Sequence, residues 1–220
     1  MARKLARLTL DNLGDLPEAV QECVFWELDP VARSRAEHAG EARSEKEAWL
    51  SHVLLEWGSC GRVAYVDGEP VGFVLYAPPV FFPGSAQLPT APIGEDAVQL
   101  ATAYVDPEHA GGGLGRVLLQ AMVKDLLKRG DIRAVEAFGT QRPHDCVLPV
   151  DFLVRCGFKT QRAHPRTPRM RMELKSVLTW KEDVEAALER LVGVVRPVKV
   201  RPSTQQQFLP RSDVPPARRP

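Results

Sequence analysis

The chain has 220 residues, of which 44% are hydrophobic and 26% are charged, a balance typical of a soluble globular protein. The formal net charge of +1 gives no argument for binding nucleic acid or an anionic membrane surface. No run approaches the roughly 18 consecutive apolar residues of a membrane span, and the basic start lacks the apolar core of a signal peptide.

The cysteines and histidines argue against two further classes of protein. Four cysteines without any C-x-x-C pair favour a reduced, cytoplasmic setting over a disulfide framework. The five histidines show no spacing typical of metal ligands, so we expect no metal site. The four cysteines are Cys23, Cys60, Cys146 and Cys156.

The first part of the chain predicts one strand and two helices. Residues 4–9 alternate weakly and predict a strand, and residues 15–18 hold the acid, proline and glutamate typical of a helix start. Pro30 is expected to end that helix, and the polar residues 31–43 are expected to form a mobile connection. A capping box opens residues 44–58, which predict a second helix closed by glycine.

The middle of the chain predicts a hairpin, because Asp67-Gly68 joins two runs rich in β-branched and aromatic residues at 62–66 and 71–76. Residues 77–95 contain five prolines and predict a loop of a length usually associated with function. Further strands are predicted at residues 98–105, 134–138, 158–160 and 170–174, and further helices at residues 114–129, 150–155 and 179–192.

These elements predict one α/β (α+β) domain over residues 1–175. Residues 176–202 are expected to form a C-terminal helical extension. Residues 203–220 are rich in proline and arginine and are expected to be disordered. An alternative role for this tail is contact with a partner, through Arg211, Arg218 and Arg219.

The most informative segment is the end of the strand at residues 98–105 and the glycines that follow it. Gly111, Gly112, Gly113 and Gly115 lead directly into a helix. Residues without Cβ let an anion approach the main chain, and the unpaired amides and dipole of a helix start attract it. Neither the Walker A pattern nor the G-x-G-x-x-G dinucleotide pattern fits these residues.

This segment resembles the coenzyme A loop of the Gcn5-related N-acetyltransferase (GNAT) family. The family pattern is Arg or Gln, two residues, Gly, one residue, and Gly or Ala. Gly113, Leu114 and Gly115 fit its last three positions, and Arg116 takes the usual basic position. Ala110 departs from the pattern at its first position, which removes a side-chain contact but leaves the main-chain amides. Cys156-Gly157-Phe158 also resembles the Gly-Phe pair of the family.

The resemblance implies a mixed, mostly antiparallel central sheet with splayed strands flanked by helices. It also implies that the main chain of Ala103, Tyr104 and Val105 pairs with the pantetheine arm of acetyl-CoA. The pyrophosphate would be held by the main-chain amides of Gly111, Gly112, Gly113, Leu114, Gly115 and Arg116.

Amine acylation needs a base for the ammonium proton, and an acid for the leaving thiolate assists it. The resemblance makes Glu136 the first candidate base, with Glu95 and Asp96 as rivals. Many family members use a tyrosine as the acid, but the matching position here is Leu153. Either His144 or Cys146 is a candidate to replace it, since imidazole and thiol have suitable ordinary pKa values.

The resemblance therefore predicts an N-acetyltransferase that moves an acyl group from coenzyme A to a primary amine of a small molecule, peptide or protein. Residues 27–41 and 77–95 are expected to line the acceptor pocket. The family also makes a homodimer the default. The alternative is a non-catalytic acyl-CoA-binding sensor or regulatory module, favoured by the missing tyrosine.

Overall fold

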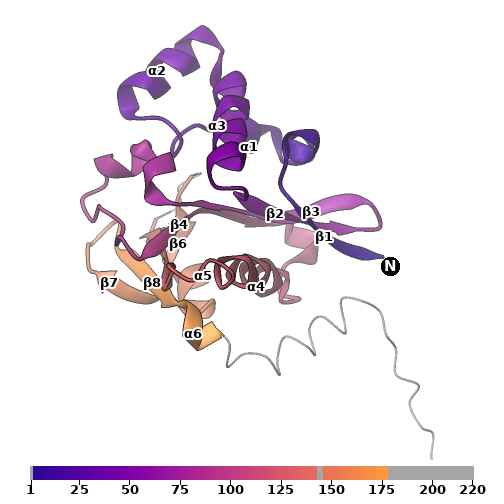
Figure 1. Ribbon diagram of the computed structural model, residues 1–220, viewed down its shortest axis with the longest axis vertical. Helices are drawn as coiled ribbons and strands as arrows, with labels where there is room; N and C mark the ends of the chain where they lie inside the picture. The colour runs from indigo at the N-terminus through magenta and orange to yellow at the C-terminus, as the bar shows by residue number, and fades with distance from the viewer. Residues whose placement is uncertain (1, 143–145, 178–220) are drawn as a thin grey trace, which may run out of the picture.

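The computed structural model describes residues 2–142 and 146–177, and in it eight strands form one mixed sheet (Figure 1). The order along the sheet is β1-β2-β3-β4-β5-β8-β7, and β6 pairs with the end of β5. All pairs are antiparallel except those of β5 with β4 and β6. The strands are β1 (Arg3–Arg7), β2 (Gly61–Val66), β3 (Glu69–Ala77), β4 (Ala97–Val105), β5 (Ala134–Thr140), β6 (Leu148–Pro149), β7 (Lys159–Arg162) and β8 (Arg169–Glu173).

Helices cover both faces of the sheet. Figure 1 shows α1, α2 and α3 on one face and α4 and α5 on the other. Side chains of successive strand residues point to opposite faces, so the apolar residues form two cores. The core on the α3 side includes Leu50, Phe73 and Phe138, and the core on the α4 side includes Leu118 and Val135. The helices are α1 (Glu18–Gln21), α2 (Pro30–Ala39), α3 (Ala42–Glu56), α4 (Leu114–Leu126), α5 (Val150–Arg155) and α6 (Leu174–Val177).

The prediction of a mobile connection at residues 31–43 is wrong, because α2 occupies most of it. The Asp29 carboxylate accepts hydrogen bonds from the amides of Val31 and Ala32, at 2.8 and 3.1 Å, and so caps the helix. Pro30 occupies the first helical turn, where its missing N–H costs nothing. The helix expected from residue 15 to Pro30 is reduced to a 3-10 helix at Leu10–Asp15 and the four-residue α1.

The expected helix at residues 179–192 and the tail at 203–220 lie outside the described residues. So does almost all of the expected extension, of which only residues 176–177, at the end of α6, are described. Within residues 2–142 and 146–177, no helix combines the length and the apolar character that crossing a bilayer requires.

Candidate active site

Strands β4 and β5 begin as partners and then separate. Only three residue pairs join them, from Ala97–Ala134 to Gln99–Glu136, although both strands continue beyond these pairs. On its other side β4 carries one extra residue, Ala101, relative to β3, a β-bulge that bends the strand. No described strand pairs with the β5-facing edge of β4 beyond Gln99. This β4–β5 fork confirms the expected splayed strands.

The chain leaves β4 through glycines whose backbone is left-handed. Gly111 and Gly113 have φ of +78° and +85°, and Gly113 is the N-cap residue of α4. The first main-chain bond of the helix runs from the Val117 amide to the Gly113 carbonyl, at 3.1 Å. The three preceding amides of α4 therefore lack partners within the helix. A Cβ on Gly113 would meet nothing within 4 Å, so the space beside this N-cap residue is open.

The start of α4 also packs tightly on α5. A Cβ on Gly115 would come within 3.2 Å of the Phe152 ring, so glycine permits this close approach. The Arg116 guanidinium donates a hydrogen bond to the Arg155 carbonyl, at 3.3 Å. Because α5 supports the first turn of α4, the amides of that turn have a fixed direction.

Glu136 lies at the last paired position before the fork opens, and its side chain is only 1% exposed. Arg171 donates to one carboxylate oxygen at 3.0 Å, and Arg169 lies 3.4 Å from the other. The Gly94 amide also donates to this carboxylate, at 3.2 Å. Glu136 is thus a buried, ion-paired carboxylate next to the point where the two strands separate.

The two rival acids before β4 have different surroundings. Arg171 donates two hydrogen bonds to Asp96, at 2.8 and 2.9 Å, so one guanidinium joins Asp96 to Glu136. These hydrogen bonds lower the pKa of the Asp96 carboxyl below its ordinary value. Glu95 is exposed. The structure therefore brings two of the three candidate bases into one cluster.

Gln99, opposite Glu136, connects the fork to the proline-rich loop. It is completely buried, and its side-chain oxygen accepts a hydrogen bond from Ser85 at 2.7 Å. Its side-chain nitrogen has no hydrogen-bond partner among the described residues. A buried amide donor without a partner is costly, so a polar group that reached it would be bound favourably.

A short segment, residues 22–29, closes the α3 side of the fork; we call it the Trp26 segment. The Trp26 indole stacks on Phe138 of β5 and donates to the Cys146 carbonyl at 2.8 Å. The Trp26 carbonyl accepts from the Gly84 amide, at 3.0 Å. These bonds bring together three stretches of chain that are remote in sequence: the Trp26 segment, the loop at 77–95 and the connection before β6.

The Trp26 segment is tied to α3 by a buried ion pair. Lys46 Nζ lies 2.5 Å from Glu27 Oε1, and the two side chains are 4% and 1% exposed. The loop at 77–95 is tied to the same helix, because the Trp49 indole donates to the Phe81 carbonyl at 2.7 Å. Both segments expected to line an acceptor pocket thus contain residues fixed to α3.

Of the two candidate acids, the structure describes only Cys146. Cys146 Sγ lies 2.9 Å from Cys23 Sγ of the Trp26 segment, and both residues are half-buried. His144 falls outside the described residues. Leu153, at the tyrosine position of the family, is completely buried in the α4-side core.

Sequence reasoning missed Arg169, Arg171, Gln99 and Cys23. The alternation Arg-Met-Arg-Met-Glu at residues 169–173 was a signal for a charged face on β8. The residues that this face contacts depend on the register of β8 against β5. Cys23 and Cys146 are 123 residues apart, and no local pattern connects them.

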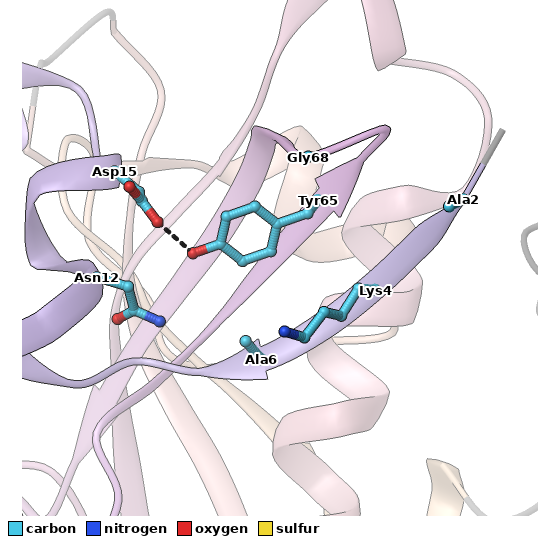
Figure 2. A pocket seen from close by; sticks show the side chains of 7 residues that line it. All are labelled: Ala2, Lys4, Ala6, Asn12, Asp15, Tyr65 and Gly68. Carbon is cyan, nitrogen blue, oxygen red and sulfur yellow. Dashed lines mark hydrogen bonds between the residues drawn. The ribbon is translucent and has the colours of Figure 1, made fainter.

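The described residues also form pockets, including one in the loop at 77–95 and one beside β1. An apolar pocket of about 360 Å³ is formed by the loop at 77–95, with Ser85, Leu88 and Ile93 among its lining residues. Another, of about 470 Å³, lies beside β1 (Figure 2). There the Tyr65 hydroxyl donates to Asp15 at 2.5 Å, and burial together with this carboxylate raises the pKa of Tyr65 to about 12.

Comparison with known proteins identifies the family that the chain matches and solved structures with a similar fold. Residues 23–158 match the acetyltransferase (GNAT) family. No curated protein sequence is significantly similar to the chain. The PaiA N-acetyltransferase of Thermoplasma acidophilum, solved with coenzyme A, has 16% identity and a TM-score of 0.53, over 79% of this chain and 99% of that one. The loading GNATL domain of CurA from Lyngbya majuscula has 14% identity and a TM-score of 0.50, over 80% and 100%. At these identities the two structures show a shared fold.

Proposed function

Because the chain belongs to the GNAT acetyltransferase family, we propose that it transfers the acetyl group of acetyl-CoA to a primary amine of a small molecule, peptide or protein. The observation that carries this proposal is the β4–β5 fork, which is followed along the chain by the first amides of α4 that lack partners within the helix. The unpaired edge of β4 at Ala103, Tyr104 and Val105 suits the amide-containing pantetheine arm. The amides of residues 111–116 suit its pyrophosphate.

The chemistry requires attack of an uncharged amine on the thioester carbonyl. The new C–N bond forms, the C–S bond breaks, and coenzyme A leaves as a thiolate that takes up a proton. We assign Glu136 as the base that accepts the ammonium proton through a water molecule, since its carboxylate is buried at the fork. Cys146 is the proposed acid, with His144 as the alternative.

The acceptor is proposed to bind on the α3 side of the fork. The apolar pocket formed by the loop at 77–95 suits an acceptor with an apolar part. The unpartnered amide nitrogen of Gln99 suits a hydrogen-bond acceptor on the same molecule. A panel of amines that differ in these two features, assayed by release of the coenzyme A thiol, tests this assignment.

Acetyl-CoA should raise the melting temperature, and Gly113→Val should abolish that rise. A ligand at about 100 times its Kd adds about 2.7 kcal/mol to the free energy of unfolding. In a domain of this size that is a rise of about 5–10 °C. Valine at Gly113 places a branched side chain into the open space before α4, where the pyrophosphate is proposed to bind. Differential scanning fluorimetry with and without acetyl-CoA measures both effects.

Gly58→Val is the matched control. Gly58 has φ of +82° and open space around its Cβ position, as Gly113 does, but it ends α3. Both substitutions should cost about 1–3 kcal/mol of backbone strain. Only Gly113→Val should lose the acetyl-CoA response. If the wild-type protein shows no response at millimolar acetyl-CoA, or if both variants respond normally, this assignment of the loop is wrong.

A further inference from the structure

Two thiols from remote parts of the chain meet on the α3 side of the fork. Cys23 belongs to the Trp26 segment, and Cys146 immediately precedes β6. Their sulfur atoms are 2.9 Å apart, whereas a disulfide needs about 2.05 Å, so a shift of less than about 1 Å would join them. The hydrogen bond from the Trp26 indole to the Cys146 carbonyl holds the two segments together.

The four cysteines fall into two chemical classes. Cys60 and Cys156 are buried, and burial raises their pKa to about 12 and about 11. Cys23 is half-buried, and its hydrogen bond with Cys146, assisted by one with the main chain of Phe25, lowers the pKa of Cys23 to about 7. The thiolate is the reactive form of cysteine, so only the Cys23–Cys146 pair combines access, reactivity and a resolving partner.

We propose that Cys23 and Cys146 form a reversible disulfide when the protein meets hydrogen peroxide. The Cys23 thiolate attacks one peroxide oxygen, the O–O bond breaks, and Cys23 becomes a sulfenic acid. The Cys146 sulfur then attacks the Cys23 sulfur, the S–O bond breaks, and water leaves. Two electrons pass from the two sulfurs to the peroxide, which ends as two molecules of water. A dithiol returns the pair to its reduced state by thiol–disulfide exchange.

The crosslink would fix the Trp26 segment to the connection before β6. Trp26, which stacks on Phe138, and Val147 both belong to the core on the α3 side of the sheet, and the loop at 77–95 already bonds to the Trp26 carbonyl. The modification concerns the covalent state of two side chains, and its occurrence does not depend on the acetyl transfer proposed above. A failure of one proposal therefore leaves the other standing.

The test treats the purified full-length protein with hydrogen peroxide at neutral pH and counts thiols under denaturing conditions. Free thiols should fall from the four of the chain to two, and dithiothreitol should restore them. Peptide mapping by mass spectrometry without reduction should show one crosslink, between Cys23 and Cys146. Cys60→Ser and Cys156→Ser should leave it unchanged, whereas Cys23→Ser or Cys146→Ser should abolish it.

Three results would overturn the proposal. The first is survival of all four thiols in a treatment that oxidises glutathione in the same tube. The second is oxidation of Cys23 to a sulfinic acid without a crosslink, and the third is a crosslink that joins two molecules. Each would mean that the contact between the two sulfurs does not lead to a bond.

Discussion

Replacing Glu136 by glutamine should lower kcat at least about 100-fold, the usual lower bound for losing a general base. The amide keeps the shape of the side chain, but it has one oxygen, which can accept from either Gly94 or Arg171, and it cannot take a proton. The acetyl-CoA-dependent rise in melting temperature should persist, because the loop at 111–116 is unchanged. Steady-state kinetics and the thermal response, measured on one preparation, separate catalysis from binding.

Asp96→Asn is the matched control for this substitution. Asp96 bonds the same guanidinium as Glu136, so both variants disturb Arg171, but Asp96 has a 40% exposed side chain and does not lie on β5. A large loss of kcat in Asp96→Asn alone would transfer the role of base to Asp96. Equal losses of kcat in both variants, accompanied by lower melting temperatures, would mean that the cluster of Glu136, Asp96 and Arg171 stabilises the fold and does not transfer a proton.

Lys46→Met should lower the free energy of unfolding by about 3–5 kcal/mol, because it leaves Glu27 as a buried charge without its cation. In a domain of this size that is a fall of about 6–20 °C in melting temperature. Chemical denaturation followed by tryptophan fluorescence measures the change directly, and Trp26 beside Glu27 should report it.

Two further variants test the cause of this loss. The double variant Glu27→Gln, Lys46→Met removes both charges, and it should recover much of the lost stability. Arg43→Met breaks the exposed pair of Arg43 with Glu47 on the same helix, and it should cost less than about 1 kcal/mol. If Lys46→Met lowers the free energy of unfolding by no more than Arg43→Met does, the buried ion pair does not hold the Trp26 segment in place.

The parts of the site that depend on the main chain could be predicted from the sequence. Glycines that run from a strand into a helix favour an anion held by main-chain amides, so the prediction for the loop at 111–116 came from a local pattern, whereas the neighbouring fork was expected from the family resemblance. The α2 helix was missed for a local reason. Pro30 is compatible with the end of one helix and with the first turn of the next, and Asp29 decides between them through its side-chain bonds.

The parts that depend on contacts between remote residues could not be predicted. Glu136 was identified as a candidate, but its pairing with Arg171 requires the register of β5 against β8. The cluster of Glu136 with Asp96 depends on the Arg171 guanidinium, which bonds both carboxylates. The Cys23–Cys146 contact requires the Trp26 segment to fold onto the end of β5, and only the complete tertiary structure provides this.

The β4–β5 fork also bears on how far the sequence of such a chain can change while the fold stays the same. It is defined by three backbone pairs and one bulge, which many combinations of β-forming side chains can satisfy. A fork of this kind therefore places few constraints on side-chain identity, in agreement with a shared fold at 14–16% identity. The stretches around Trp26 and Ser85 instead make specific side-chain contacts, since the Trp26 indole donates to the Cys146 carbonyl and the Ser85 hydroxyl donates to Gln99. A shared fold is thus silent about the acceptor, whose proposed site depends on these two stretches of this chain.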